Sequence, residues 1–285
     1  MDPADDDSGL VRAATPDETA DVAAMHASNQ TAWDEAAERY ERWLPEAIEL
    51  IRGGGTNLLP PELEAIGDLH SRCRRAIHLQ CAGGRDTLSL WNLGADEVVG
   101  VDFSQRMLDL AQRLTEAVGA PATWIQADVL STPHSLDGTA DLLYTGRGSL
   151  VWLQDLDAWA AVLHRLLAPD GRLVLFEGHP IEWLFDADES GYWVATDYDY
   201  FAGAEASKGW APEYIDRLSI PEPDQAWKFA RSWTLGEVVT AIAGAGLRIE
   251  RLAEHPTDWW GGHGDVRTEE RSRIPLSYSL IARRG

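Results

Sequence analysis

The sequence has few cysteines, no long apolar run and a shortage of basic residues. Its 285 residues include two cysteines, Cys73 and Cys81, too few for a disulfide framework and without the spacing of a metal site. No apolar stretch reaches the roughly 18 residues that a membrane span needs. The segment MDPADDDSGL at the N-terminus is acidic, unlike a signal or transit peptide. We therefore expect a cytoplasmic protein that binds no metal and no membrane.

The shortage of positive charge also limits the partners. The chain carries 24 Lys and Arg against 47 Asp and Glu, a net charge of -23. Because binding to nucleic-acid phosphates depends on many basic side chains, this balance argues against nucleic acid. A chain of this length can bury a full core as one large domain or as one domain with a substantial insertion. The sequence leaves a homodimer open.

Strand-like and helix-like segments alternate through the middle of the chain. Short apolar strands are predicted at 76–80, 97–102, 122–128, 140–146 and 172–178. Helices are predicted at 86–91, 104–118 and 153–167, and a turn at 168–171. A helix at 235–245 and strands at 247–254 and 276–284 follow. This alternation is typical of an α/β fold with a parallel sheet covered on both faces.

Composition divides the chain into five segments. We expect a disordered acidic tail at 1–17, a helical segment at 18–70, the core at 71–180, an aromatic-rich insertion at 181–233 and the end of the core at 234–285. Aromatic residues make up 9% of the chain, but twelve lie in the insertion: Trp183, Phe185, Tyr192, Trp193, Tyr198, Tyr200, Phe201, Trp210, Tyr214, Trp227, Phe229 and Trp233.

The stretch IHLQCAGGRDTLSLW, at 77–91, has the form of a ligand-binding turn between a strand and a helix. Ala82, Gly83 and Gly84 are small enough for a ligand to approach the backbone closely. Asp102 ends the next strand, near the spacing at which an acidic side chain meets a ribose. The alternative is a plain loop followed by a helix cap at Asp102. The two features together favour a cofactor cradle.

With these motifs the chain resembles the class I S-adenosylmethionine (SAM)-dependent methyltransferases, in a bacterial small-molecule subgroup. The segments VVGVDFSQRMLDLAQ, QADVL and LLAPDGRLVLFEGH are similar to that family's second strand, adenine-edge segment and fifth strand. The family pattern acidic-x-Gly-x-Gly-x-Gly falls on His78, Gln80, Ala82 and Gly84, so only its last glycine is kept. The resemblance implies a Rossmann-like, seven-stranded, mostly parallel sheet with an antiparallel last strand. It also implies N-terminal helices and a cap inserted after the fifth strand.

The resemblance also implies SAM as cofactor and suggests how it is held. Asp102 would bind the ribose, Phe103 would lie beside the adenine and Asp128 would meet the exocyclic amine. Tyr40 would hold the carboxylate or amine of SAM, unless it only packs in the helix core. The cofactor-binding candidates are Tyr40, His78, Gln80, Cys81, Ala82, Gly83, Gly84, Asp102, Phe103, Met107, Asp128, Val129 and Thr145.

A nicotinamide dinucleotide fits the same turn poorly. Its pyrophosphate sits on a helix N-terminus, and Asp86 would put a negative charge beside it. SAM has no phosphate and carries a positive sulfonium, so an acidic first helical turn does not oppose it. The turn therefore favours SAM.

Catalytic candidates lie in the loops after the fourth and fifth strands, where open parallel sheets bind ligands. His179 has a suitable pKa for a general base, unless it is a structural histidine bonded to the backbone near Pro180. Glu177 is a weaker base or would orient His179. Tyr144 completes the catalytic set. Because SAM carries a good leaving group, holding the acceptor aligned is the main task of the enzyme.

The insertion is interpreted either as a small core of its own or as a lid over an acceptor pocket. The substrate-binding candidates are Trp33, Arg147, Trp152, Trp183, Tyr200 and Trp233, with Arg147 binding an acidic group or pairing with a surface carboxylate. We expect methyl transfer to N, C or O of a small specialised metabolite, planar and aromatic or indole-bearing. The alternatives are a ligand-binding protein without turnover and a protein methyltransferase.

Overall fold

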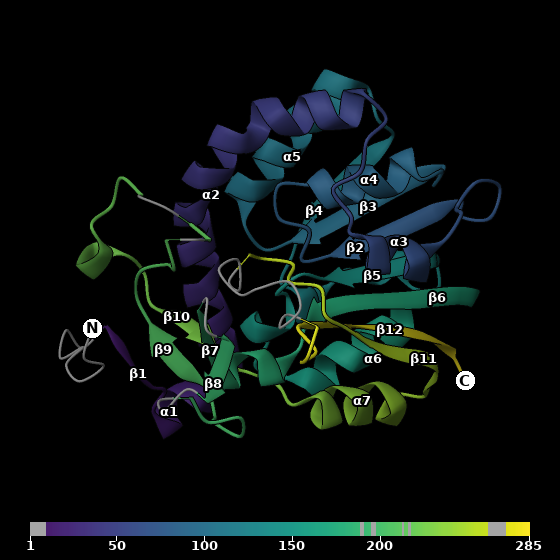
Figure 1. Ribbon diagram of the computed structural model, residues 1–285. Helices are drawn as coiled ribbons and strands as arrows, with labels where there is room; N and C mark the ends of the chain where they lie inside the picture. The colour runs from purple at the N-terminus through teal and green to yellow at the C-terminus, as the bar shows by residue number, and fades with distance from the viewer. Residues whose placement is uncertain (1–9, 189–190, 195–197, 213, 216–217, 262–271) are drawn as a thin grey trace.

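A seven-stranded sheet of order β11-β12-β6-β5-β2-β3-β4 forms the centre of the computed structural model (Figure 1), which describes residues 10–188, 191–194, 198–212, 214–215, 218–261 and 272–285. β12 is antiparallel to both neighbours, and the other pairings are parallel. The predicted mostly parallel sheet with an antiparallel last strand is therefore confirmed. Its strands are β2 (Arg75–Leu79), β3 (Glu97–Asp102), β4 (Ala122–Gln126), β5 (Ala140–Gly146), β6 (Leu167–Gly178), β11 (Leu247–His255) and β12 (Ser277–Arg284).

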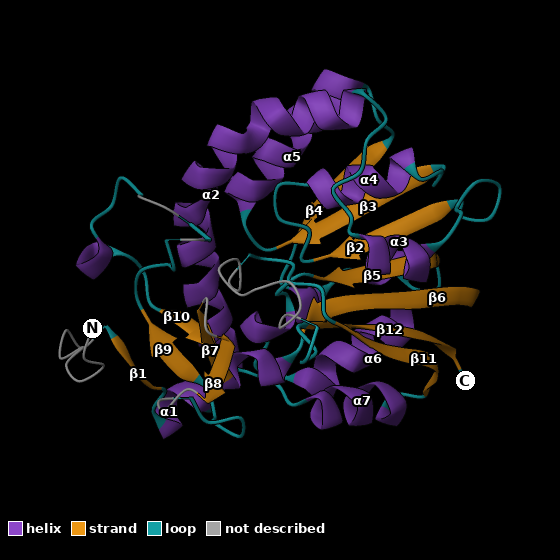
Figure 2. Cartoon of the chain, in the orientation of Figure 1, coloured by secondary structure: helices purple, strands orange, loops and turns teal. Residues whose placement is uncertain are grey.

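Helices cover both faces of this sheet (Figure 2). One face carries α3 (Pro60–Ile66), α4 (Arg85–Asn92) and α5 (Gln105–Val118), with the long α2 (Val22–Arg52) packed on α4 and α5. The other face carries α6 (Leu156–Leu166) and α7 (Leu235–Gly244). Alternate strand residues supply the two cores: in β5, Leu143 packs toward α6, and Leu142 and Tyr144 pack toward α2 and α4.

Local signals explain most helix starts, and two predicted boundaries move. The side chain of Asp155 caps α6, so this helix begins at Leu156 and the preceding η3 (Leu150–Trp152) is a separate turn. The turn predicted at 168–171 lies within β6, whose pairing with β5 shifts register between Ala140 and Leu142. The remaining short turns are η1 (Val129–Ser131), η2 (His134–Leu136), η4 (Pro180–Leu184) and η5 (Glu222–Asp224).

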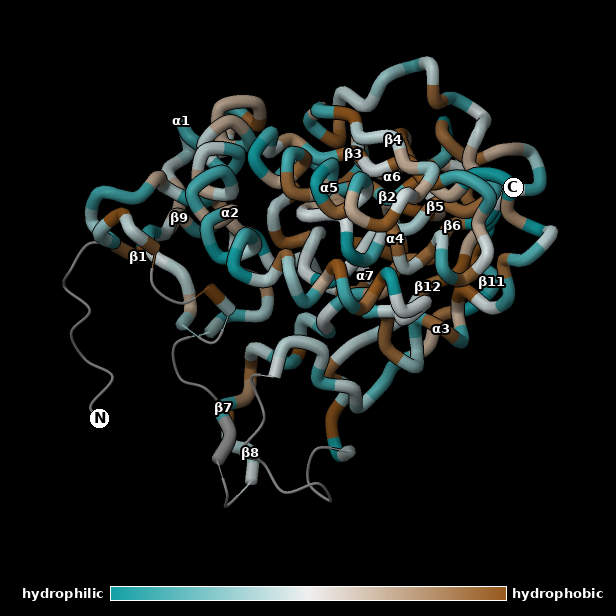
Figure 3. The backbone as a smooth tube through the Cα atoms, turned by 90° about the horizontal axis from the view of Figure 1, so that it is seen from above, coloured by the Kyte–Doolittle hydropathy of each residue, from teal (hydrophilic) through white to brown (hydrophobic). Residues whose placement is uncertain are grey.

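A small sheet of order β1-β9-β10 forms the cap beside the N-terminal half of α2. Its strands are β1 (Val11–Ala13), β9 (Glu205–Ser207) and β10 (Lys228–Ala230). A hairpin of β7 (Phe185–Asp188) and β8 (Gly191–Val194) stands off from the main sheet in Figure 3. Two buried hydrogen bonds join the Asn29 side chain on α2 to the backbone of Phe229 at 2.7 and 2.9 Å, which fixes the cap to the helix.

The prediction of a disordered tail at 1–17 is wrong for its last residues. Residues 1–9 lie outside the described part, but Val11–Ala13 pair with β9, and α1 (Pro16–Thr19) follows. Thr15 and Glu18 form a capping box, and Glu18 also pairs with Arg12 at 2.8 Å. These local bonds give ordered structure to a segment that is poor in apolar residues.

In the described ranges, no helix is long and apolar enough to cross a membrane. Within the same ranges, no three His, Cys, Asp or Glu side chains are grouped as a metal site would require. Both cysteines are buried and free, and burial raises the pKa of Cys73 to about 12.

Candidate functional site

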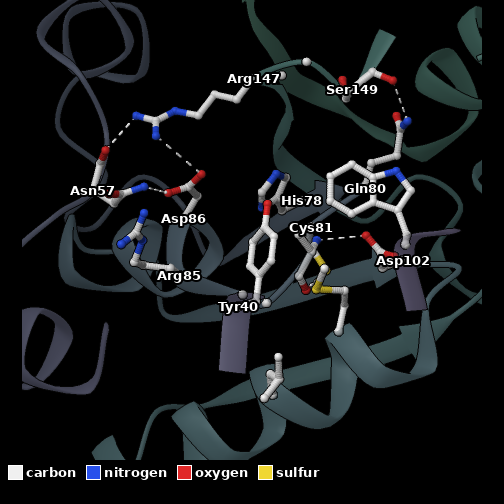
Figure 4. Close-up of a pocket in the computed structure, with 18 of the residues that line it drawn as sticks. Tyr40, Asn57, His78, Gln80, Cys81, Arg85, Asp86, Asp102, Arg147 and Ser149 are labelled. Atoms are coloured by element: carbon white, nitrogen blue, oxygen red, sulfur yellow. Dashed lines mark hydrogen bonds and ion pairs between the residues drawn. The ribbon is translucent and has the colours of Figure 1, made fainter. Parts of the chain in front are cut away.

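A cavity of about 370 Å³ lies at the carboxyl ends of β2, β3 and β5, beneath α2 (Figure 4). Such ends are where open parallel sheets bind ligands. It is lined by Trp33, Tyr40, Trp43, Leu44, Ala47, Asn57, His78, Gln80, Cys81, Ala82, Gly83, Gly84, Arg85, Asp86, Asp102, Phe103, Met107, Leu110, Gly146, Arg147, Gly148, Ser149, Trp152, Tyr214, Trp259 and Trp260.

The loop after β2 has left-handed backbone at three alternate residues. The φ angles are 57° at Gln80, 44° at Ala82 and 79° at Gly84. These are the positions where the sequence pattern lacks two of its three glycines. Glycine adopts positive φ freely, and other residues adopt it at a cost. The loop therefore has the backbone conformation of a glycine-rich turn, although only one of its three left-handed residues is a glycine.

Hydrogen bonds to neighbouring strands hold this strained loop. The backbone N–H of Ala82 donates to Asp102 Oδ2 at 2.8 Å, and Gln80 Nε2 donates to the backbone oxygen of Ser149 at 2.9 Å. The other amide atom, Gln80 Oε1, is buried without a hydrogen-bond partner. An unpaired buried acceptor costs free energy, so a donor from a bound ligand would stabilise this wall of the cavity.

The positive φ at Ala82 leads to a stability prediction. Ala82→Gly should raise the free energy of unfolding by up to about 1 kcal/mol, because relief of the left-handed strain exceeds the added chain entropy. Urea unfolding measures the change. Ala117→Gly, on the exposed face of helix α5, is the matched control and should lose about 0.5–1 kcal/mol. Equal losses in both variants would show that Ala82 is not strained.

Asp102 is the acidic group at the centre of the loop system. Its carboxylate accepts the backbone N–H groups of Ala82 and Ser104 at 2.8 and 2.9 Å, and its residue is 9% exposed. Burial raises the pKa of Asp102 to about 6, although these two hydrogen bonds act to lower it. Asp102 is therefore ionised at neutral pH and becomes protonated in mild acid.

A buried ion network closes one end of the cavity. Arg147 donates to both carboxylate oxygens of Glu62, which is fully buried, and Tyr144 donates its hydroxyl hydrogen to the same carboxylate. Arg147 also lies 3.8 Å from Asp86 Oδ2. Burial lowers the pKa of Arg147, but Asp86 and Glu62 raise it by more. The network therefore keeps a permanent cation beside the cavity.

His78, the residue in the acidic position of the family pattern, is neutral. Burial lowers its pKa to about 4, and Asp86 only partly opposes this. Nδ1 is bonded to Thr87 Oγ1 at 2.8 Å, and the ring packs at 4.8 Å on Tyr144. His78 thus supplies shape and one hydrogen bond to its surroundings, and no negative charge.

Aromatic side chains form another part of the cavity wall. Trp33 on α2 makes edge contacts with Tyr40, Trp152 and Tyr214 at centroid distances of 5.5 to 6.2 Å. The hydroxyls of Tyr40 and Tyr214 lie 3.2 Å apart. Burial raises the pKa of Tyr40 to about 12, so both phenols stay neutral near pH 7 and can donate hydrogen bonds. The wall suits an apolar, flat ligand with a polar edge.

Comparison with known proteins identifies the core. Residues 76–171 match the family model described as "Methyltransferase domain". The central part of the core is therefore similar to a methyltransferase domain. A curated relative, the demethylmenaquinone methyltransferase of Thermus thermophilus, is 39% identical over 84 residues, which cover 30% of this chain. The match spans 37% of that relative's length.

Solved structures show the same fold at low identity. A SAM-dependent methyltransferase of Mesorhizobium loti is 23% identical with a TM-score of 0.54, covering 79% of this chain and 96% of its own. The CcbJ methyltransferase of Streptomyces caelestis is 18% identical with a TM-score of 0.59, covering 90% and 98%. The predicted class I methyltransferase fold is thereby confirmed.

Ten of the predicted cofactor-binding residues line the cavity, and three do not. Asp128 accepts a hydrogen bond at 2.6 Å from His26 on α2 and caps the turn that starts at Val129. Val129 is in the core on the α6 side, and Thr145 bonds Ser149 Oγ at 3.1 Å. The ten that line it are Tyr40, His78, Gln80, Cys81, Ala82, Gly83, Gly84, Asp102, Phe103 and Met107.

None of the three catalytic candidates lines the cavity. His179 accepts a hydrogen bond from the backbone N–H of Ile181 and lies 3.0 Å from Glu254. These contacts agree with the alternative given above, a structural histidine bonded to the backbone near Pro180. Glu177 does not orient His179; its carboxylate accepts from the backbone at 148–150 and from the Ser149 hydroxyl, and so fixes the loop after β5. Tyr144 is in the ion network.

Half of the substrate candidates line the cavity: Trp33, Arg147 and Trp152. Trp183 is 40% exposed, Tyr200 packs on Phe201, and Trp233 donates to the backbone of Leu153; none of the three lines the cavity. Arg147 pairs with a buried carboxylate and not with a surface one. Tyr214 was predicted only as one of the twelve aromatics of the insertion, and Asn57 and Trp259, in irregular segments, were not predicted as site residues. Arg85 and Asp86 were visible in the motif, but not as site residues.

Proposed function

We propose that the chain is a SAM-dependent methyltransferase that acts on a small, planar acceptor. The observation that carries the proposal is one cavity lined by the loop at 80–84 with its left-handed residues, by Asp102 and by aromatic rings. The named acceptor of the Thermus relative, demethylmenaquinone, is a small molecule, which agrees with this. The atom that accepts the methyl group, N, C or O, is left to experiment.

The residues present fit SAM. Gly83 and Gly84 line the cavity, and the orphaned Gln80 Oε1 can accept a hydrogen bond from the cofactor. Asp102 would accept from the ribose hydroxyls, with Phe103 and Met107 beside the adenosine. When bound, SAM supplies an activated methyl group on a sulfonium that leaves as a neutral thioether.

The role of the protein is to align the acceptor and exclude water. Trp33 and Trp152 would pack on its flat body, and the hydroxyl hydrogen that the Tyr40–Tyr214 pair leaves free would be donated to a polar edge. Holding nucleophile and methyl group in line supplies much of the rate, since the reactant already carries a good leaving group. His179 lies elsewhere, so we propose no proton transfer through it.

Calorimetry with S-adenosylhomocysteine tests the cofactor site. The wild type should bind it, and Asp102→Ala should weaken binding by about 1–3 kcal/mol, the scale of a lost charge-assisted hydrogen bond. Because the pKa of Asp102 is raised to about 6, wild-type affinity should fall as the pH drops below that value. Asp102→Asn should show no such fall. Binding of NAD without S-adenosylhomocysteine would refute the proposal.

Turnover separates an enzyme from a binding protein on the same fold. A panel of aromatic amines, phenols and indoles is incubated with SAM, and S-adenosylhomocysteine is measured. Its accumulation with one class of acceptor identifies the nucleophile. Tight cofactor binding with no product from any small acceptor would favour the binding protein or a protein acceptor.

A further inference from the structure

A pair of opposite charges lies in the cavity at the end away from Asp102. In Figure 4, Tyr40 and His78 separate Asp102 from Arg85 and Asp86, which are the first two residues of α4. A cofactor whose ribose is bound by Asp102, as proposed above, and that extends along the loop would bring its other end to this pair. In SAM that end is the zwitterionic methionine, an ammonium and a carboxylate on one carbon.

Asp86 is an ionised carboxylate with an open side. Burial would raise its pKa, but Arg147 and Asn57 lower it by more. Asn57 Nδ2 donates to Oδ1 at 2.5 Å, whereas Oδ2 has only the distant Arg147 guanidinium at 3.8 Å. With 19% of its side chain exposed and facing the cavity, Asp86 can accept a charge-assisted hydrogen bond from an ammonium.

Arg85 is a cation whose position the fold does not explain. It occupies the first helical residue of α4, where the helix dipole disfavours positive charge. Its guanidinium makes no hydrogen bond or ion pair with any residue that the structure describes, yet it lines the cavity beside Asp86. A guanidinium in such a place suits a carboxylate ligand.

Because His78 is neutral, another side chain must supply the negative charge for a bound ammonium. At the position where the family pattern has an acid, His78 offers no negative charge toward an ammonium. Asp86 lies close enough to affect the pKa of His78. Among the described lining residues at this end of the cavity, Asp86 is the acidic one, and Arg147 does not reach it at hydrogen-bond distance. The acidic side chain at this end of the cavity is therefore Asp86 on α4, and not the residue at position 78 on β2.

We propose that Asp86 binds the ammonium and Arg85 the carboxylate of the methionine part of SAM. The inference rests on the proposed function, and it assigns to these two residues a binding role that the sequence motif alone did not reveal.

Two cofactor fragments test the assignment by calorimetry. S-adenosylhomocysteine carries the amino-acid end, and 5′-methylthioadenosine lacks it but keeps the adenosine and the sulfur. Asp86→Asn and Arg85→Gln should each weaken S-adenosylhomocysteine about ten- to a hundredfold and change 5′-methylthioadenosine less than about threefold. Asp102→Ala should weaken both ligands alike, because both contain the ribose.

Asp109→Asn and Arg74→Gln make the same charge changes at exposed positions and should leave both affinities unchanged. Thermal unfolding confirms that each variant is folded. If a substitution at Asp86 or Arg85 weakens both ligands equally, or weakens neither, the proposed role of that residue is wrong. The proposed cofactor site would not be affected by that result. Failure of the wild type to bind S-adenosylhomocysteine would overturn the proposed function instead.

Discussion

Arg147→Met should lower the free energy of unfolding by about 3–5 kcal/mol, the largest loss expected from a single side chain at this site. The substitution leaves Glu62, which is fully buried, without the guanidinium that donates to both of its oxygens. A buried charge without a partner costs far more than the pair itself contributes. Urea unfolding of the two proteins measures the difference.

Two further variants separate the charge from the packing. Glu62→Gln in the Arg147→Met background removes the stranded charge and should recover more than half of the loss. Arg75→Met, whose ion pair with Glu97 is partly exposed, should cost less than about 1 kcal/mol. A loss that small for Arg147→Met would mean that water reaches Glu62.

Gly84→Ala should destabilise the protein by about 2–5 kcal/mol, because two costs add. The residue has a φ of 79°, which disfavours a side chain by about 1–2 kcal/mol. A Cβ would also lie 2.5 Å from the ring of Trp124 and 2.7 Å from Ala111, and overpacking costs about 1–3 kcal/mol. The measurement is urea unfolding.

Gly119→Ala is the matched control for Gly84→Ala. Gly119 has a φ of 72°, and a Cβ there would have no other atom within 4 Å. It therefore reports the backbone cost alone, about 1–2 kcal/mol. The excess loss at Gly84 measures the contact with Trp124. Similar losses at both positions would show that Trp124 moves aside freely.

The central sheet was predictable from sequence because its strands are local apolar runs. β3 and β5 have the predicted bounds, since each run is flanked by polar or turn residues that end it. The cap was not predictable in this way. β1 has three residues and pairs with β9 almost two hundred positions later, which no local pattern encodes.

At the candidate site, the sequence predicted the location of those residues that directly follow a strand. The small-residue loop and Asp102 line the cavity, since the ends of adjacent parallel strands meet at one edge. The prediction failed for His179, because the pKa of a free histidine does not show whether its ring faces a cavity or caps a turn. It also missed Tyr214, whose place depends on how the insertion folds back over α2.

The pairing of β1 with β9 has a consequence for the order in which the protein forms during synthesis. Val11 leaves the ribosome long before its partner Ser207, and the Asn29 side chain waits longer still for Phe229. The cofactor loop at 80–84 and its neighbour strands are complete much earlier. Domains fold as their chain emerges, so the cofactor loop can form first, and the cap is joined to α2 only after residue 229 has been made.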